Sequence, residues 1–382
     1  MSLSVFEQGD AERMLVCADT LPSKTSEIRY LSEFLRLGPK RLIETSDLLR
    51  LVIRQGDEFI PVVVNDGSES LCYLVSPEVH YVRYMQEELA KIRKSPSAIA
   101  LSIAVGAMGR VASPLGFNRF VSVNNWLLTT SQSIRWTRDG LGELTAYLAR
   151  RFIDFPVVFR GVDLRRAEAR PMFEAAGCDL VIHRPVLESN ASSVRASRDR
   201  KRLFRGDQRL LEQSRFELRI DADLEPGEER AIARLYRQLY LEKHSRFNVR
   251  YTPEFFRRVL DVGLERLVTA RLNGELVGFI TTRNDGDRLI CALVGYDVRL
   301  SQREFPIYRT MMAAALRMAL AEQKICFLST GNATFKRQRG GMEWFEYEAV
   351  YQRHLRPHRR LPWWMFRKAF DRAKNRVDTG QI

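Results

Sequence analysis

The sequence predicts an α/β protein of two related domains, because one order of elements occurs twice, about 170 residues apart. The first copy has the order strand, helix, strand, short helix, strand over residues 117–131, 140–152, 156–162, 166–176 and 179–187. The second copy repeats this order over residues 289–298, 306–323, 325–330, 333–339 and 344–351. Glycines close the short helix in both copies, at Gly177 and at Gly340 and Gly341. Strands that alternate with helices of this length indicate α/β units rather than a helical bundle or a β-sandwich.

Length and composition favour a globular protein with two cores. The chain has 382 residues, which is long for one core, and its 45% hydrophobic and 28% charged residues are ordinary for a globular protein. The N-terminal residues do not resemble a secretory signal, and the longest apolar run, residues 99–108, is about half of what crosses a bilayer. The five cysteines are scattered, so we expect reduced thiols, no metal site and a cytoplasmic location.

Most of the net charge of +14 comes from two segments. Residues 195–219 contain nine basic and four acidic residues, and residues 351–382 contain nine basic and two acidic residues. Positive charge concentrated in this way attracts phosphates or an anionic surface. Solvated helix faces are the alternative for each segment.

In the N-terminal half we expect a lead-in segment, residues 1–59, that is irregular or partly helical, followed by a domain at 60–190. Asp66 and Gly67 predict a hairpin between strands at 60–65 and 71–76. A helix with an apolar stripe follows from His80, and residues 99–111 are predicted as a strand or a bent pair of strands.

In the C-terminal half we expect a domain at 191–355, preceded by a polar junction at 189–193, and then a basic amphipathic tail at 356–382. One helix begins after Pro226 and Gly227, and a second is capped by Thr252. Two predicted hairpins follow, one turning at Asn273 and Gly274 and the other at Asp285 and Gly286. The order is two helices, three antiparallel strands, a long helix, a strand, a short helix and a strand.

This order, with the hairpin LVTARLNGELVGFITTR, resembles the GCN5-related N-acetyltransferase (GNAT) fold. The duplication narrows the resemblance to the FemAB-like branch, in which two such domains are fused. The segment Ser197–Phe204 is similar to the basic segment of that branch, and Phe335, Lys336, Arg339 and Gly340 match a motif near its end. The resemblance covers about residues 60–355 and implies two tandem GNAT-like domains, each with a mixed, mostly antiparallel sheet flanked by helices.

The resemblance implies an acyltransferase whose donor is acyl-CoA, as a co-substrate rather than a tightly bound cofactor, or an aminoacyl-tRNA. In GNAT proteins the N-terminus of the long helix faces the donor pyrophosphate, and a helix N-terminus is a suitable anion site. Members that bind acetyl-CoA usually have a glycine-rich loop there. This chain has no glycine between Gly295 and Gly331, so its backbone cannot approach a pyrophosphate as closely.

Amine acylation requires stabilisation of an oxyanion and a route for a proton, and the resemblance places candidates for both roles. Lys336, Asp297 and Tyr308 are the expected catalytic residues: a cation for the oxyanion or a donor phosphate, a proton acceptor, and a proton donor or phosphate contact. The expected donor-binding residues are Tyr296, Arg299, Arg303, Arg309, Asn332 and Arg339. The alternatives are ordinary ones: a surface lysine, an aspartate at a strand end, a core tyrosine and arginines that solvate a helix end.

The expected acceptor-binding residues are Arg200, Lys201, His244, Arg246 and Asn248. His244 closes a helix, where a histidine also simply complements the helix dipole. In the tail, tryptophans join basic residues, which fits either a peripheral membrane contact through residues 356–376 or packing of the aromatic side chains on a domain.

These expectations combine into one function: transfer of an acyl or aminoacyl group from acyl-CoA or aminoacyl-tRNA to an amine of a sugar, peptide or lipid-linked acceptor. The enzyme would be cytoplasmic, with peripheral contact to the inner membrane and a role at the cell envelope left open. A non-catalytic binding or regulatory protein that keeps the GNAT fold is the alternative, and the missing glycine loop motivates it.

Overall fold

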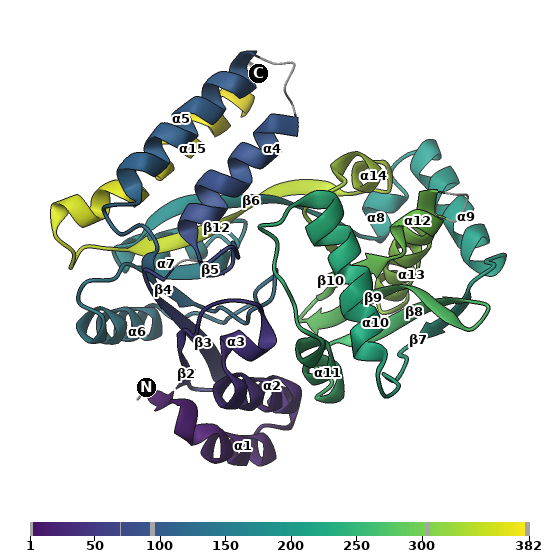
Figure 1. Cartoon of the computed structure of the whole chain (residues 1–382), viewed down its shortest axis with the longest axis horizontal. Helices are drawn as coiled ribbons and strands as arrows, with labels where there is room; N and C mark the ends of the chain where they lie inside the picture. Colours follow the sequence, from purple (N-terminus) through teal and green to yellow (C-terminus); the bar gives the residue numbers. More distant parts are fainter. Residues whose placement is uncertain (1–2, 69, 92–95, 303–305, 379–382) are drawn as a thin grey trace. The chain divides into compact units, whose positions relative to one another are not determined.

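The computed structural model describes residues 3–68, 70–91, 96–302 and 306–378, which form two compact units. Unit 1 contains residues 1–183, 247–249 and 346–382, and unit 2 contains residues 184–246 and 250–345. Unit 1 thus includes both the lead-in segment and the tail, and the division at His183 lies a few residues before the expected junction at 189–193. Each unit is a mixed α/β structure (Figure 1).

Unit 1 has its strands in the order β1-β2-β3-β4-β5-β12. The strands are β1 (Ser4–Phe6), β2 (Leu49–Gln55), β3 (Glu58–Asp66), β4 (Arg119–Val123), β5 (Val157–Val162) and β12 (Met342–Tyr351). The main helices are α1 (Ala11–Thr20), α2 (Thr25–Leu37), α3 (Pro39–Leu42), α4 (Met85–Lys91), α5 (Pro96–Ala112), α6 (Arg138–Arg151), α7 (Ala169–Ala175) and α15 (Pro357–Asp378). β4 and β5 are parallel, and their neighbours in this order pair antiparallel.

Unit 2 has its strands in the order β6-β11-β10-β9-β8-β7. The strands are β6 (Asp179–Ser189), β7 (Glu217–Ile220), β8 (Arg266–Leu272), β9 (Glu275–Asp285), β10 (Arg288–Tyr296) and β11 (Ile325–Ser329). The helices are α8 (Ala191–Val194), α9 (Arg198–Glu212), α10 (Glu228–Arg237), the π-helical turn η4 (Gln238–His244), α11 (Pro253–Asp261), α12 (Val298–Gln302), α13 (Ile307–Ala321) and α14 (Ala333–Gln338). β10 and β11 are parallel, and the other pairs are antiparallel.

The two units have the same topology, as the repeated pattern predicts. In both, helices follow the first strand, the next three strands pair antiparallel, and a helix leads to a parallel strand; in unit 1, α4 and α5 lie between the second and third of these three strands. The last strand of each half is exchanged: β6 begins in unit 1 and pairs with β11 in unit 2, whereas β12 begins in unit 2 and pairs with β5 in unit 1. The chain is therefore a tandem α/β protein in which each sheet is completed by the other half's last strand.

The predicted hairpins of the C-terminal half are confirmed. β8 and β9 turn at Asn273 and Gly274, both with positive φ, and β9 and β10 turn at Gly286, also with positive φ. This conformation at both central residues produces the tight turn that matches the strand twist. Thr252 caps α11, because its side chain accepts a hydrogen bond from the Phe255 N–H at 3.2 Å.

Two predictions for unit 1 are wrong. The segment 99–111 lies in helix α5, where small residues allow close packing on the preceding helical segment: a Cβ at Gly109 would lie 2.7 Å from the Val82 side chain. The hairpin turn lies between β2 and β3, where Gln55 pairs with Glu58, and not at Asp66 and Gly67. Residues 71–76 form no strand. The apolar residues of this segment resemble a strand because Val75 and its neighbours are buried, but the segment that buries them is irregular.

Two more segments of unit 1 differ in extent from the expectation. Of the predicted strand 117–131, only β4 forms, because the chain leaves the sheet at Asn124 and Leu127, which have positive φ. The lead-in segment is largely helical through α1 and α2, and Leu31 and Phe34 of α2 are fully buried.

The C-terminal helix α15 packs on unit 1 through its aromatic side chains. Trp363 and Phe366 are buried in a cluster with Tyr81 and Phe117, and the Phe117 and Phe366 rings stack with centroids 4.9 Å apart. Of the two alternatives for the tail, packing on the domain therefore applies to these two residues. Trp364 is exposed.

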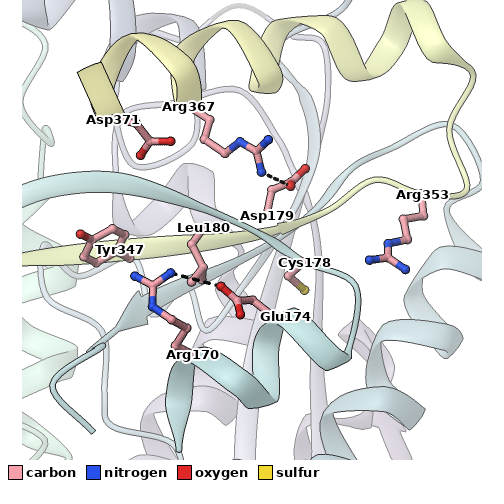
Figure 2. Close-up of a pocket in the computed structure, with 9 residues that line it drawn as sticks. All are labelled: Arg170, Glu174, Cys178, Asp179, Leu180, Tyr347, Arg353, Arg367 and Asp371. Carbon is pink, nitrogen blue, oxygen red and sulfur yellow. Dashed lines mark hydrogen bonds and ion pairs between the residues drawn. The ribbon is translucent and has the colours of Figure 1, made fainter. Parts of the chain in front are cut away.

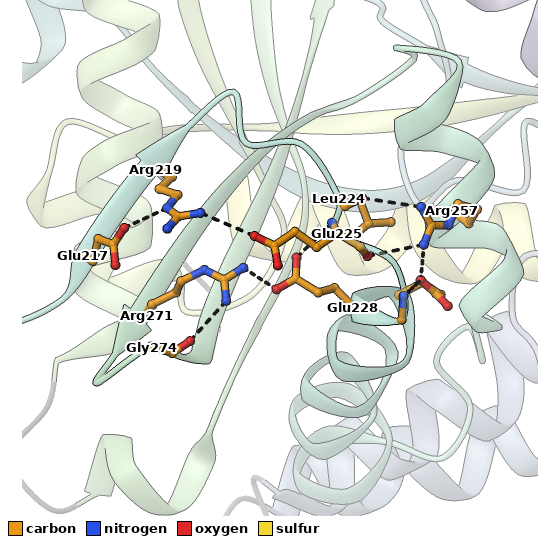
Figure 3. Close-up of polar contacts among 10 residues, drawn as sticks. Glu217, Arg219, Leu224, Glu225, Glu228, Arg257, Arg271 and Gly274 are labelled. Carbon is orange, nitrogen blue, oxygen red and sulfur yellow. Dashed lines mark hydrogen bonds and ion pairs between the residues drawn. The ribbon is translucent and has the colours of Figure 1, made fainter.

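Ion pairs fix helix α10 on the sheet of unit 2 (Figure 3). Arg271 of β8 pairs with Glu228 in the first turn of α10, and both side chains are largely buried. Arg257 of α11 pairs with Glu229 and also donates to the carbonyl oxygens of Leu224 and Glu225 at 3.5 and 3.4 Å. The α10 helix, and with it η4, is thereby held at its N-terminal end.

Among the described residues, no helix combines the length and the apolar character needed to cross a bilayer.

Candidate active site

The candidate site lies where the parallel strands β10 and β11 separate. They pair only at their beginnings, from Arg288 with Ile325 to Ile290 with Phe327. Beyond this point β10 continues beside β9 to Tyr296, with a register shift between Cys291 and Val294. The carboxyl ends of the two strands are therefore not bonded to each other, and such points are common binding positions in α/β proteins.

Lys336 holds the end of β11. Its side chain is buried, and Nζ donates to the carbonyl oxygens of Leu328, Ser329 and Thr330 at 2.6, 3.5 and 2.5 Å. Burial lowers its pKa to about 8, with a further contribution from Arg184, while the three carbonyl acceptors favour the charged form. All three ammonium protons can be donated in this way, so Lys336 positions the backbone where the site opens. The alternative of a surface lysine is wrong.

Tyr308 lies in the first turn of α13, beside the end of β10 and the helix α14. Its ring centroid is 6.1 Å from that of Tyr296 on β10 and 5.2 Å from that of Phe335 on α14. Burial raises the pKa of the phenol, with contributions from Cys291 and Tyr296, and a side-chain hydrogen bond with Asn332 acts in the opposite direction. The phenol therefore keeps its proton at neutral pH, and its O–H group can donate a hydrogen bond.

A buried aspartate, which sequence reasoning missed, joins three helices at this site. Asp207 of α9 accepts from Arg309 Nε of α13 at 2.6 Å and from Arg339 Nε, just after α14, at 2.7 Å. Arg339 also lies over the Phe335 ring at 3.7 Å. Arg309 and Arg339, two of the four arginines predicted to bind the donor, are thus engaged within the protein. The sequence feature that could have revealed Asp207 is its position as the single acidic residue on the inner face of a very basic helix.

Residues 297–302, which directly follow β10, form a capped helical turn. Asp297 Oδ1 accepts from the backbone N–H groups of Arg299 and Leu300 at 2.9 and 3.0 Å, and so caps α12. Arg299 is exposed. Arg303 lies outside the described residues.

On the predicted acceptor side, η4 reaches the end of β10. Lys243, which was not predicted, places Nζ 5.8 Å from the centre of the Tyr296 ring. His244 is exposed and lies beside Tyr240, with ring centroids 6.2 Å apart, and Arg246 is also exposed. Asn248 is buried and belongs to unit 1.

Helix α9 supplies the other two predicted acceptor residues. Arg200 is half-buried and donates to the Ser193 carbonyl oxygen at 3.2 Å, so it joins α9 to α8. Lys201 is exposed. The role of both residues in acceptor binding stays a prediction.

A hollow of about 500 Å³ lies in unit 1 between α7, β6, β12 and α15 (Figure 2). Most of its charged side chains pair with one another: Arg170 with Glu174 at 3.1 Å, and Arg367 with Asp179. Burial raises the pKa of its Cys178 thiol to about 12, so this sulfur is not an activated nucleophile.

Over the described residues, no three His, Cys, Asp or Glu side chains are grouped as metal ligands would be.

The comparison with protein families identifies the C-terminal half. The family model "Acetyltransferase (GNAT) domain" matches residues 197–337, a range that contains α9, η4, β10, α13 and Lys336. Residues 197–337 form an acyltransferase domain of the GNAT family. Asp207, Tyr296, Tyr308 and Lys336 of the site lie within the matched range and Arg339 lies just beyond it, and unit 1 repeats the strand order of unit 2.

Solved structures that resemble this chain include FemX, with a TM-score of 0.47 and 8% identity over 80% of this chain and 87% of that one. Another is a tandem GNAT protein from the clavulanic acid biosynthesis pathway, with a TM-score of 0.40 and 10% identity over 92% of this chain and 98% of that one. A third is L-PGS from Bacillus licheniformis, with a TM-score of 0.43 and 11% identity over 60% of this chain and 78% of that one. All three TM-scores are below 0.5, so the assignment rests on the matched family. No curated protein matches the chain in sequence.

Proposed function

We propose that unit 2 transfers an acyl or aminoacyl group to the amine of a sugar, peptide or lipid-linked acceptor, as a FemAB-like N-acyltransferase. The observation that supports this most directly is the protonated phenol of Tyr308 beside the separated ends of β10 and β11. A buried proton donor next to an opening in the sheet suits a reaction that releases a thiolate or an alkoxide.

In the proposed step, the neutral acceptor amine attacks the carbonyl carbon of the donor, and a tetrahedral intermediate forms. The bond to sulfur, or to oxygen in an aminoacyl ester, then breaks, and the leaving group takes a proton from Tyr308. Asp297, directly or through water, accepts the proton that the amine loses. Lys336 contributes by holding the carbonyl groups of Leu328 and Thr330, and so the shape of the β11 end.

The donor is acyl-CoA or an aminoacyl-tRNA. A helix N-terminus presents backbone N–H groups that suit a phosphate, and we propose this role for the start of α13. Tyr296, Arg299, Arg303 and Asn332 are proposed donor contacts. Because Asp207 engages Arg309 and Arg339, these two arginines act on the donor through the position of α13 and α14.

The test separates donor binding from chemistry. Calorimetric titration with acetyl-CoA and longer acyl-CoAs measures binding, and release of free CoA with a panel of amine acceptors measures turnover. We expect Tyr308→Phe to bind the donor as wild type does and to lose turnover by about a hundredfold or more, the usual contribution of a general acid. Tyr347→Phe is the matched control, since Tyr347 is a buried tyrosine in unit 1.

Donor binding with full turnover in Tyr308→Phe would contradict the role of the phenol. Absence of acyl-CoA binding would point to aminoacyl-tRNA, for which the same variants are compared in a deacylation assay with the same amines. Absence of activity with both donors would leave a GNAT fold used for binding alone.

A further inference from the structure

Helix α5 of unit 1 is apolar on both of its faces. Its inner face packs through Ala98, Val105, Gly109 and Ala112, which are buried. Its outer face carries exposed residues at helical spacing: Ile99, Ala100, Ile103, Ala104, Ala107 and Val111. Ile103 is 69% exposed, Ile99 52% and Val111 46%. A helix that is apolar on all sides is normally buried. Among the described residues the outer face of α5 is instead exposed, and an exposed apolar face of this kind is typical of an interaction surface.

A second helix extends the apolar surface and adds positive charge. α15 packs beside α5 in the cluster that contains Val105, Ala112, Trp363 and Phe366 (Figure 1). Its exposed residues at helical spacing are Leu361, Trp364, Lys368 and Arg372. Trp364 is 49% exposed and Leu361 37%. α15 contains seven Lys and Arg residues against two Asp, and Arg110 is the single charged residue in the sequence of α5.

The electric field of the basic residues of α15 extends over the outer face of α5. Packed helices lie about 8–10 Å apart, and electrostatic screening at 0.1 M salt acts over about 10 Å, so an anionic surface in contact with α5 also experiences the field of α15. The neighbouring α4 carries Glu87 and Glu88, and Glu88 is paired with Lys91. The surface is therefore apolar in the centre and mainly basic beside it.

A second copy of the chain is a poorer fit to this face. α5 has 17 residues and is about 26 Å long, so with a width of about 10 Å its outer face offers about 260 Å². A stable protein interface buries about 800 Å² on each partner. Contact between two copies would also bring two strongly basic helices together.

We propose that the outer face of α5, with the exposed Trp364 and basic residues of α15, docks on the surface of an anionic lipid bilayer. α5 lies in the plane of the interface with Ile99, Ile103 and Val111 among the acyl chains, as amphipathic interfacial helices do, and Lys368, Arg372 and Arg110 contact lipid phosphates. This docking is independent of the acyl-transfer chemistry of unit 2.

Flotation with vesicles tests the proposal on the full chain, using vesicles of phosphatidylcholine alone and vesicles that also contain phosphatidylglycerol. Wild type is expected to bind the anionic vesicles, and to bind less as salt is raised. Ile103→Glu should weaken this binding about tenfold or more, because a charge then replaces an inserted apolar side chain. Ile153→Glu is the matched control: Ile153 is also in unit 1 and is 68% exposed, against 69% for Ile103.

Lys368→Glu combined with Arg372→Glu should weaken binding to the anionic vesicles and leave thermal unfolding unchanged, since both side chains are exposed. Failure of wild type to bind anionic vesicles would overturn the proposal, as would equal losses in Ile103→Glu and Ile153→Glu. A dimer in solution that Ile103→Glu alone converts to a monomer, measured by light scattering, would also overturn it in favour of a second copy on α5.

Discussion

At the scale of single residues, the site depends on buried polar groups that the protein itself satisfies. Lys336 donates to three backbone carbonyls, and Asp207 accepts from two arginines. Both side chains therefore bond to the protein itself rather than to a ligand. Both fix the elements around Tyr308, so we regard them as positioning residues.

Asp207→Asn should destabilise the protein by about 2–3 kcal/mol, because charge-assisted hydrogen bonds are lost and Arg339 is left largely buried without its carboxylate. Chemical denaturation measures this change. Asp199→Asn on the same helix is the control: its pair with Arg202 is exposed, so the change should stay below about 0.5 kcal/mol. Equal effects of the two substitutions would show that the Asp207 cluster contributes little.

The sequence supports the choice of Lys336 and Tyr308 but not their roles. The motif containing Lys336 is local and can be recognised, whereas the carbonyl groups that it binds become neighbours only after β11 ends in an irregular backbone. Asp207 is separated from Arg309 and Arg339 by 102 and 132 positions. A long-range pair of this kind has no spacing by which a single sequence could reveal it.

At the scale of elements, close packing of helices on strands shapes the site. Gly295 near the end of β10 lies under α10: a Cβ there would meet the Tyr236 backbone nitrogen at 2.8 Å and the Phe279 ring at 2.4 Å. Because backbone atoms cannot move aside locally, any larger residue must shift α10, which leads into η4, away from β10.

Gly295→Ala should therefore destabilise the protein by about 1–3 kcal/mol, the range for overpacking, and should displace η4 from the acceptor side. Gly142→Ala in α6 is the control, since no atom lies within 4 Å of its new Cβ and alanine favours a helix by about 0.5–1 kcal/mol. Thermal unfolding of both variants measures the contrast. A neutral Gly295→Ala would mean that α10 has room to move on the strand.

Elements were predictable from sequence where turn chemistry marks their ends. Asn273 and Gly274 identified a hairpin correctly because two adjacent residues must adopt positive φ there. Asp66 and Gly67 gave the same signal without a hairpin: Asn65 and Asp66 bind the backbone N–H groups of Gly67 and Ser68 instead, and the chain leaves the sheet. Helix α5 was missed because both of its faces are apolar, which removes the periodicity that distinguishes a helix from a buried strand.

At the scale of the whole molecule, the sequence was sufficient to predict the repeat but not the exchange of strands. β6 and β12 follow equivalent short helices in the two halves, as the pattern predicts. Which sheet each strand enters is decided by pairing with β11 and β5, contacts distant in the sequence. The tail lies in unit 1 for the same reason, because the chain has already returned there with β12.

This exchange predicts that unit 1 cannot fold without the C-terminal residues. A chain that ends at Phe345 loses the part of β12 that pairs with β5, from Tyr347 to Tyr351, and loses α15 with the buried Trp363 and Phe366. Burial of each large side chain contributes about 1.5–3 kcal/mol, and β5 would gain an unpaired edge. In a thermal scan followed by circular dichroism we expect the truncated chain to lose the unfolding transition of unit 1 and to keep that of unit 2. A chain that ends at Asp378 is the control and should unfold like the full chain, and a truncation at Phe345 that keeps both transitions would show that β12 is dispensable for unit 1.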